Sequence, residues 1–371
     1  MKQRALISVL LLLAPGLRAH AQVTQTQDPP SEEKPYETRY SFATINDATF
    51  YGDPQTPQPS ILNQVLLELT FSLRYRDRWK FSTSLVGFLK TTAERDSSSE
   101  TNTRLNVKEA YGGFSEGDLD FTLGRKMVRW GTGYAFTAAG VLDPPRDPTN
   151  PTDRLNTNQG RDMIKADWVH GQHALTVAYS TDELAPAGST LHDTTAFRYN
   201  VLVHGFDTSL IAGNDRGVDT FGALTFTRVT GQAWEIHGEA AWSEQGAILG
   251  GAKYATPAGV TFIGEFFTQP DTPYFRDMSP SHMPGRQNYG FFNVSKSRLR
   301  ERPGWKEWDL SGSIVTDFND HSYTAVFDVN RWFGNHFSSY LHVEVPQGSS
   351  KSEYGSAPNA TATSVGVRFH L

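Results

Sequence analysis

Charged side chains recur at every second position of several apolar segments of this 371-residue chain, and their signs differ between its two halves. Alternate side chains of a β-strand share one face, so these charges would line one surface together. Facing walls of opposite charge order water and favour small polar or zwitterionic solutes over apolar ones. We expect the following residues to line a passage or its constriction: Arg74, Arg76, Lys80, Arg125, Arg129, Arg146, Asp147, Arg154, Arg161, Lys165, Glu235 and Glu239.

Further charged residues occupy the same phase and extend the two walls. The first half adds Lys90 and Arg198, the second half adds His237, Glu265, Asp328, His342 and Glu344, and the last segment adds Arg368 and His370. One wall is therefore basic and the other acidic. The alternative interpretation is that these positions are polar only because they face water.

The segment 132–159 is the best candidate for a constriction that folds into such a passage. It is long for a loop, and four prolines stiffen it. The prolines are Pro144, Pro145, Pro148 and Pro151, and the charges between them come from Arg146, Asp147, Asp153 and Arg154. The alternative is an external loop that shields the rim or contacts a neighbouring subunit.

Catalytic and metal-binding patterns are weak. Asp320-His321-Ser322 and His336–Ser338 contain the residue types of a hydrolase triad, but turns collect these residues in any case. His170 and His173 have no third ligand nearby, and Asp143, Asp147 and Asp153 match no calcium-loop spacing. The chain contains no cysteine, which excludes thiolate chemistry, disulfides and a lipoprotein anchor. We expect neither a cofactor nor a metal site.

The elements that would position these charges are β-strands of a transmembrane barrel. In the final segment, Val365, Val367, Phe369 and Leu371 alternate with Ser364, Gly366, Arg368 and His370. A terminal strand with an apolar last residue is typical of outer-membrane barrels and is read by their insertion machinery. The alternation also fits a strand that separates lipid from a wet lumen.

The same period of two recurs along the chain and predicts about 18 antiparallel strands, with 14 or 16 as alternatives. It is clearest between Val65 and Tyr75, which a turn at Asp77-Arg78 reverses. Short turns alternate with longer loops at about 93–103, 132–159, 183–193 and 269–285, as in barrels with short periplasmic turns. Consistent alternation requires strands at about 38–50 and at Gln287 to Lys296. The fold class is all-β.

The N-terminus has the features of a secretory signal peptide. Lys2 and Arg4 precede an apolar stretch, and Ala19-His20-Ala21 fits a cleavage site. We therefore divide the chain into a signal peptide (1–21), a disordered periplasmic lead (22–37) and a barrel (38–371).

Composition agrees with this division. The chain has 34 Lys and Arg against 40 Asp and Glu, and removal of the three basic residues before residue 22 leaves a net charge of −9. This balance argues against nucleic-acid binding. The mean hydropathy of −0.46 is compatible with a barrel, whose strands keep half of their residues in a polar lumen. Aromatic residues make up 12%, which girdles at two membrane interfaces would explain.

One hairpin carries a family resemblance. Glu109-Ala110-Tyr111, then Leu119-Asp120-Phe121 and the stretch from Gly124 to Gly131, resemble a hairpin in porin-like outer-membrane barrels of the alginate-export and anion-selective group. The loop Asp143-Pro144-Pro145-Arg146-Asp147-Pro148 resembles the Pro-Arg-Asp loop of that group. The resemblance covers about 60 residues and implies a Gram-negative outer-membrane channel without specifying its solute.

Within this hairpin we expect Glu109 to face Arg125 across the two strands, if the turn centres near Gly117. Both residues lie in phase with apolar Tyr111 and Leu123. Either a bulge at Gly124 turns Arg125 inward, or a loop shields the pair from lipid. The simpler alternative is that the pair only fixes the strand register.

The sequence thus predicts an outer-membrane porin, a passive or weakly selective channel for small hydrophilic solutes. The alternatives are an outer-membrane hydrolase and a non-conducting structural or adhesive barrel. The expected partners are outer-membrane lipid and lipopolysaccharide, the barrel assembly machinery through the C-terminal strand, small polar solutes, and further copies in a homo-oligomer. Ion selectivity is left open because the two walls nearly cancel.

Overall fold

The computed structural model describes residues 35–54, 60–93, 100–144, 146–181, 193–216, 219–243, 246–269, 287–297, 307–357 and 359–371. The expected signal peptide, 1–21, lies outside the described residues, as does the expected lead up to residue 34. The first strand begins at Tyr36, two residues before the expected start of the barrel.

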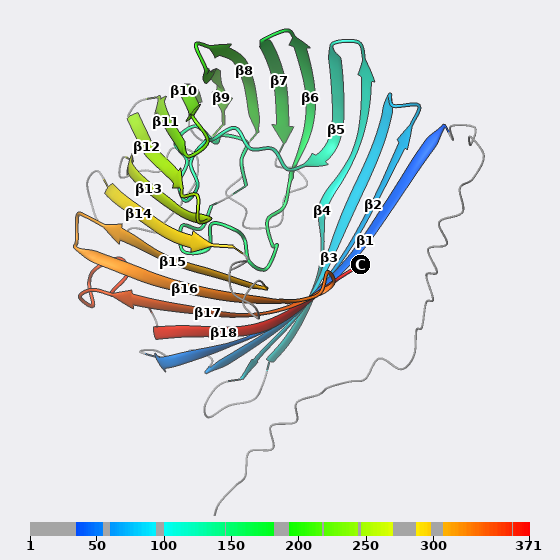
Figure 1. Ribbon diagram of the computed structural model, residues 1–371. Coiled ribbons are helices and arrows are strands. Elements are labelled where there is room, and N and C mark those ends of the chain that lie inside the picture. The colour runs from blue at the N-terminus through cyan, green and yellow to red at the C-terminus, as the bar shows by residue number, and fades with distance from the viewer. Residues whose placement is uncertain are drawn as a thin grey trace, which may run out of the picture. The chain divides into compact units, whose positions relative to one another are not determined.

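Eighteen strands account for nearly all of the regular structure (Figure 1). They are β1 (Tyr36–Pro54), β2 (Ile61–Tyr75), β3 (Trp79–Ala93), β4 (Glu100–Glu116), β5 (Leu119–Lys126), β6 (Arg161–His170), β7 (His173–Thr181), β8 (Thr194–Val203), β9 (Phe206–Asp215), β10 (Asp219–Thr230), β11 (Trp234–Trp242), β12 (Gly246–Ala255), β13 (Val260–Gln269), β14 (Gln287–Lys296), β15 (Trp308–Asp317), β16 (Ser322–Phe333), β17 (Phe337–Gln347) and β18 (Asn359–His370). Among the described residues, no helix is both long enough and apolar enough to cross a membrane.

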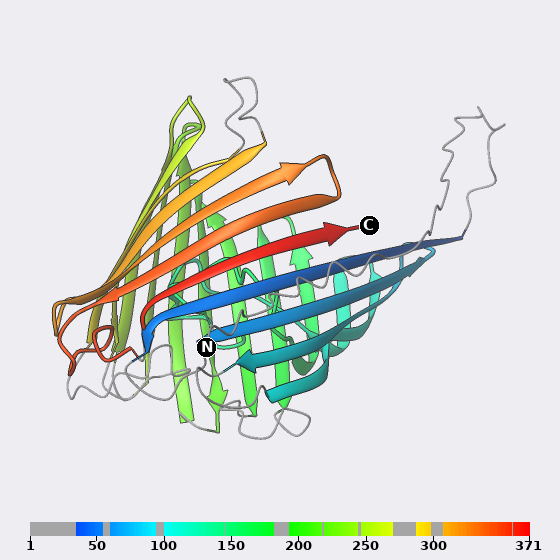
Figure 2. The same cartoon turned by 90° about the horizontal axis from the view of Figure 1, so that it is seen from below.

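Each strand pairs antiparallel with its neighbours in sequence, and β1 also pairs with β18. The closing register places Ala43 opposite His370 and Thr49 opposite Ser364. Figure 2 shows β18 lying beside β1 where the ring closes. The predicted all-β barrel with 18 strands is confirmed, and closure removes exposed strand edges.

The predicted alternation of short turns and long loops is also present. Short turns follow the even-numbered strands β2, β4, β6 and β8, and we call this the short-turn end. Arg76 and Asp77 adopt left-handed backbone conformations (φ 49° and 54°), as do His204 and Gly205 (φ 51° and 79°). Two consecutive residues with positive φ make the tight turn whose twist matches paired strands.

Apolar residues of the predicted outward phase are exposed on the outside of the barrel, as a lipid-facing surface requires. Leu69 is 56% exposed and Ile164 is 59% exposed, although both lie in the middle of strands. Further outward residues that follow the predicted phase are Leu67, Trp79, Phe81, Trp168, Leu175, Val177, Tyr179, Phe197, Tyr199, Trp234, Ile236, Trp242, Ile314, Tyr323, Phe327, Val365 and Val367.

The inward face differs from the expected polar lumen, because part of it is apolar and buried. The inward residues of β7–β15 include Ile211, Phe221, Phe267, Tyr289 and Val315, each at most 3% exposed. They form one cluster with residues 130–142 of the loop between β5 and β6. The alternation could not reveal this core, since it is covered by a loop and not by another sheet.

Gly366, in the C-terminal motif, has a specific packing role. It lies opposite Tyr340 on β17, and a Cβ atom at this position would overlap the Tyr340 ring. The missing side chain lets the ring of Tyr340 lie flat across β18 inside the barrel. An inward glycine beside an aromatic residue is a recognised device for placing such rings in barrels.

A pair of arginine substitutions tests the assignment of the two faces. Leu69→Arg places a charge on the lipid-facing surface and should destabilise the inserted barrel by roughly 2 to 4 kcal/mol. Thr70→Arg, one residue later on the lumen face beside Glu68, should destabilise it far less. Refolding into lipid vesicles over a urea gradient measures both. Equal losses in the two variants would contradict the assigned phase.

Candidate functional site

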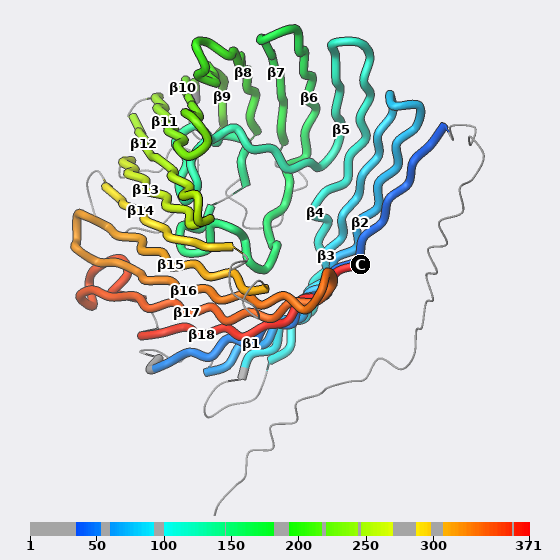
Figure 3. The backbone as a smooth tube through the Cα atoms, viewed as in Figure 1, coloured from blue at the N-terminus to red at the C-terminus, as the bar shows by residue number. Residues whose placement is uncertain are grey.

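The loop between β5 and β6, residues 127–160, folds into the barrel and crosses its interior (Figure 3). Trp130, Phe136 and Leu142 are at most 4% exposed, and Ala135 and Ala139 are completely buried. This loop was expected as either an inward constriction or an external rim loop, and the structure shows the inward arrangement. We call residues 127–160 the constriction loop.

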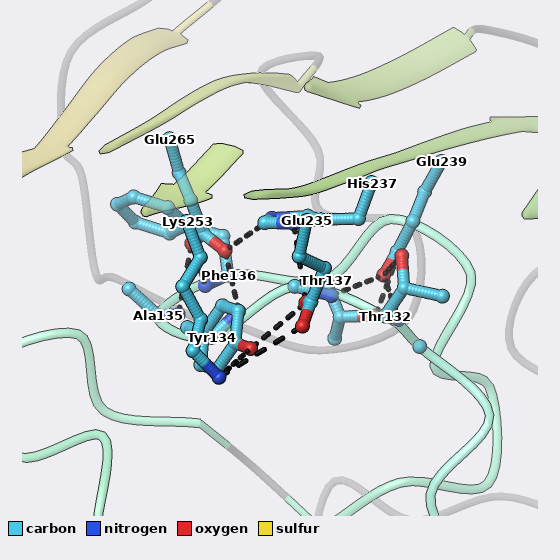
Figure 4. Close-up of polar contacts among 12 residues, drawn as sticks. Thr132, Tyr134, Ala135, Phe136, Thr137, Glu235, His237, Glu239, Lys253 and Glu265 are labelled. Carbon is cyan, nitrogen blue, oxygen red and sulfur yellow. Dashed lines mark hydrogen bonds and ion pairs between the residues drawn. The ribbon is translucent and has the colours of Figure 1, made fainter. Parts of the chain in front are cut away.

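Glu239 on β11 holds the first part of this loop (Figure 4). One carboxylate oxygen accepts hydrogen bonds from the backbone N–H groups of Thr132 and Gly133, and the other from those of Ala138 (2.6 Å) and Ala139 (2.8 Å). The hydroxyls of Thr132 and Thr137 also donate to it. Glu239 is 2% exposed, so the loop has replaced water around this carboxylate.

Glu265 on β13 makes a second clamp beside the first. Its carboxylate accepts the N–H groups of Tyr134 (2.5 Å), Ala135 (2.9 Å) and Phe136 (3.4 Å). Nε2 of His237 lies 2.9 Å from the same carboxylate, and the His237 ring packs edge-on against Tyr134. Charge-assisted bonds of this kind are stronger than neutral ones.

The Tyr134 side chain extends this contact toward β11 and β12. Its hydroxyl donates to Oε1 of Glu235 (2.8 Å) and accepts from Nζ of Lys253 (3.0 Å). Burial raises the pKa of Tyr134 above its ordinary value, which keeps the hydroxyl protonated and able to donate. Glu235, expected to face solutes, is therefore engaged by the loop.

Arg146 fixes the fold of the loop from within. It forms an ion pair with Asp143 (2.9 Å) and donates to the carbonyl oxygens of Gly131, Gly133 and Phe136. Asp143 in turn accepts the N–H of Trp130 (2.6 Å). The Pro-Arg-Asp segment singled out in the sequence thus organises the loop, and the guanidinium of Arg146 is largely committed to it.

Arg154 attaches the far part of the loop to the opposite side of the barrel. Its guanidinium forms an ion pair with Asp47 on β1 and donates to the Tyr340 hydroxyl on β17 (3.2 Å). The guanidinium also lies over the Tyr340 ring, 5.2 Å from its centre. Arg368 on β18 donates to the Arg154 carbonyl (2.7 Å). The loop therefore spans the lumen from β11 and β13 to β17, β18 and β1.

Lys108 forms a third attachment that the sequence did not predict. It is an extra residue in β4, because Ser84 pairs with Glu109 while Leu85 pairs with Val107. The bulge turns Lys108 inward, where it donates to Asn156 of the loop (2.5 Å) and to Glu68 on β2 (3.2 Å). A bulge re-aims side chains without leaving a periodic signal in the sequence.

Three basic residues of the inward phase stay fully or partly exposed: Arg74 and Lys80 beside a short turn, and Lys126 at the other end of β5. Arg74 and Lys80 are cross-strand partners, and both are exposed. Nζ of Lys80 and Nζ of Lys126 lie 5.5 Å and 4.8 Å from the centre of the Tyr111 ring. Within the described chain, neither lysine has a carboxylate in ion-pair distance. We call Arg74, Lys80, Lys126 and Tyr111 the basic face.

The other basic residues that we expected along the passage are engaged by neighbouring groups or lie in a turn. Arg161 donates to the Val141 carbonyl and to Thr194 (2.9 Å each), and Lys165 is paired with Asp167. Arg76 lies in the turn 76–78.

Arg125 does not face Glu109, so that expected pair is wrong. The turn contains two residues, Gly117 and Asp118, which places Arg125 opposite Ala110. Arg125 pairs with Asp162 on β6 (2.5 Å), in phase with outward Leu123 and Ile164. Glu109 instead accepts the N–H of Met127 (2.8 Å) at the start of the constriction loop.

Arg129 and Asp147 line a polar pocket that the constriction loop forms with its own residues. Tyr134, Arg146 and Asp153 also contribute to its walls. Arg129 is exposed, and Asp147 is exposed while it accepts the N–H of Thr149 (2.9 Å). Of the four predicted residues within the constriction loop, these two are exposed, whereas Arg146 and Arg154 are partly buried.

The weak catalytic patterns have other roles in the structure. Ser322 is buried and its Oγ accepts the N–H of Tyr354 (3.2 Å), while Asp320 accepts the N–H of Ser322 (2.8 Å). His321 lies in the exposed turn between β15 and β16. Among the described residues, no group of three His, Asp or Glu side chains is arranged to hold a metal ion.

Comparison with known proteins shows the fold and nothing finer. No family model and no curated protein matches the sequence. Among solved structures, OccK5 (OpdH) of Pseudomonas aeruginosa matches with a TM-score of 0.62 at 9% identity, covering 90% of this chain and 98% of that one. The outer membrane protein OprD of the same organism gives 0.60 at 11% identity, covering 90% and 94%. Wzi of Escherichia coli, a carbohydrate-binding outer-membrane barrel, gives 0.57 at 11% identity, covering 88% and 84%.

These similarities confirm the expected resemblance to porin-like outer-membrane barrels at the level of fold. The chain has the closed 18-stranded architecture of outer-membrane porins over nine-tenths of its length. At about 10% identity, roles of individual residues do not transfer from these proteins.

The Glu239 clamp predicts that the constriction loop detaches when this carboxylate is lost. In Glu239→Gln, a charged acceptor is replaced by a weaker one whose amide group faces N–H donors, which should cost roughly 2 to 4 kcal/mol. Because the chain has no cysteine, A138C reports on the loop alone. The thiol of A138C is buried in the parent background, so it should react slowly with a water-soluble maleimide. In the E239Q background the same thiol should react readily.

Glu116→Gln provides the matched control, since Glu116 lies at an exposed turn and its ion pair within the described residues is with Arg78. A surface pair of this kind contributes little. Equal labelling of A138C in the E239Q, E116Q and parent backgrounds would show that the clamp does not hold the loop.

Proposed function

We propose that this protein is an outer-membrane porin that admits small hydrophilic solutes by diffusion past the constriction loop. The observation that carries the proposal is the loop itself, which crosses the lumen and is attached to opposite walls through Glu239 and Arg154. An open 18-stranded barrel would leave a wide aqueous channel. A loop fixed across it narrows the channel without the need for a moving part.

We further infer a preference for anions. The acidic wall expected from the sequence is largely occupied, because Glu235, Glu239 and Glu265 bind the constriction loop. The basic face stays uncovered, and the positive charge of Arg129 beside the loop offsets the negative charge of exposed Asp147 in the same pocket. The field along the solute path is therefore positive, which raises the local concentration of anions.

This arrangement also bears on the alternatives. The residues of the hydrolase-like pattern at Asp320–Ser322 serve a turn, which favours transport over catalysis at this position. A structural or adhesive barrel would need a lumen closed to ions, and only conduction can distinguish it from a channel. Export through the signal peptide, insertion through the C-terminal strand, lipopolysaccharide contact and assembly into oligomers stay predictions.

Planar-bilayer recording of the refolded chain tests the channel. Discrete current steps are expected, and deletion of residues 143–154 should increase the step size, because it removes both Arg146 and Arg154 from the constriction loop. A correctly folded barrel that passes no current would overturn the proposal. An unchanged step size after the deletion would show that the loop does not set the constriction.

Salt-gradient recordings test the preference for anions. The parent should have a reversal potential on the anion side, and the triple variant K80Q/K126Q/R129Q should lower the anion-to-cation permeability ratio several-fold, because it removes three uncommitted positive charges near the path. Arg216→Gln, in the exposed turn after β9, is the control that removes one charge from the surface. A cation preference in the parent would contradict the inferred field.

A further inference from the structure

The segment between β17 and β18, residues 348–357, folds back onto the turn between β15 and β16. The N–H of Glu353 donates to Asp320 (2.5 Å), and the N–H of Tyr354 donates to Ser322 (3.2 Å). The segment is also closed on itself, since the N–H of Ser356 donates to the carbonyl of Ser352 (2.9 Å). It is therefore an ordered unit seated on the barrel wall.

The Glu353 side chain is the connection between this unit and the wall. Its Oε2 accepts a hydrogen bond from the Tyr289 hydroxyl on β14 (2.9 Å). Its carboxyl group also lies next to that of Asp317, the fully buried last residue of β15. Two neighbouring carboxyl groups at a buried position favour a proton on one of them, because two carboxylates repel each other.

Tyr289 links this carboxyl pair to the constriction loop. The Tyr289 ring is 1% exposed and lies 5.7 Å from the ring of Phe136 and 6.4 Å from that of Phe267. Phe136 belongs to the constriction loop and stacks on Phe267 at 5.2 Å. Tyr354 packs against the same cluster. A continuous packed path thus runs from Glu353 to the part of the loop that Glu265 holds.

We propose that residues 348–357 form a proton-operated latch, in which protonated Glu353 holds the segment on Asp317 and Tyr289 and thereby stabilises the constriction loop. The link to permeation rests on the proposed function, whereas the latch itself does not. The titratable groups that face Glu353 are Asp317 from β15, Asp320 from the turn, Tyr289 from β14 and Tyr354 beside it. Asp317 and Asp320 oppose a negative charge on Glu353, whereas the hydrogen bond from the Tyr289 hydroxyl favours it, and burial outweighs this bond.

The direction of the pH effect follows from Glu353. Burial, reinforced by Asp317 and Asp320, raises its pKa from 4.5 to about 7. The latched state therefore binds the proton more tightly than a released segment does. At pH values between the ordinary and the raised pKa of Glu353, release of the segment is accompanied by loss of a proton. Rising pH therefore favours the released state, and the released-to-latched ratio becomes constant above the raised pKa. The released-to-latched ratio should increase on the order of tenfold or more across this interval.

A spin label on the cysteine-free chain tests the latch directly. Ser350 is exposed, so S350C carries the label without disturbing the packing. In the refolded full chain, label mobility should rise between pH 5 and pH 8.5. With Glu353→Gln, which can still bond to Tyr289 and Asp317 but does not ionise, mobility should stay low at every pH. E116Q is the control and should follow the parent.

Maleimide labelling of A138C, at the same pH values, tests the link to the constriction loop. At each pH, the labelling rate of A138C in the parent background is divided by its labelling rate in the E353Q background. This division removes the intrinsic pH dependence of the thiol, and the resulting ratio should rise with pH. Mobility that does not change with pH, an E353Q variant that follows the parent, or a flat labelling ratio would each overturn the proposal. A channel that passes no current would count against the proposed function alone, because neither label requires conduction.

Discussion

Backbone N–H groups that enter a barrel lumen must find acceptors, and this requirement governs the interior of the protein. The constriction loop carries little regular structure that could pair these groups internally. Glu239 and Glu265 supply the acceptors, each binding several consecutive N–H groups of residues 132–139. Small residues such as Ala135, Ala138 and Ala139 allow the loop backbone to approach the wall this closely.

The same clamps decide how charge is distributed in the lumen. The chain is acidic overall, with a net charge of −6, yet the charges left open around the constriction are mainly basic. The reason is that inward acids are used as acceptors for the loop, whereas Lys80 and Lys126 lie over an aromatic ring without a carboxylate partner in the described chain. In this barrel, the net charge of the whole chain therefore does not determine the sign of the electric field at the constriction.

Along β7–β15 the wall of the barrel carries apolar side chains on both sides, with the acidic clamps between them on the inner side. The outer side meets lipid, and the inner side packs against Trp130, Phe136 and Leu142 of the loop. The inner cluster resembles the core of a water-soluble protein and contributes the hydrophobic stabilisation that an open lumen lacks. This core also connects Glu353 to the loop through the packed ring of Tyr289.

Period-two alternation predicted the outward face and, together with the loop lengths, a strand number of about 18. These features are local, because neighbouring side chains of a strand always point to opposite sides. The exceptions were also local in origin. A two-residue turn at Gly117-Asp118 shifted one register, and the bulge at Lys108 reversed the direction of a single side chain.

Only the tertiary structure decided which charges meet. Glu239 binds Thr132 across 107 positions of sequence, and Asp47 binds Tyr340 across 293. Such contacts depend on closure of β1 against β18 and on the path of the loop through the lumen, which no periodic pattern encodes. The sequence therefore identified the charged residues of the interior. Their division between structural clamps and a surface open to solutes required the closed barrel, because that division depends on where the loop backbone needs its acceptors.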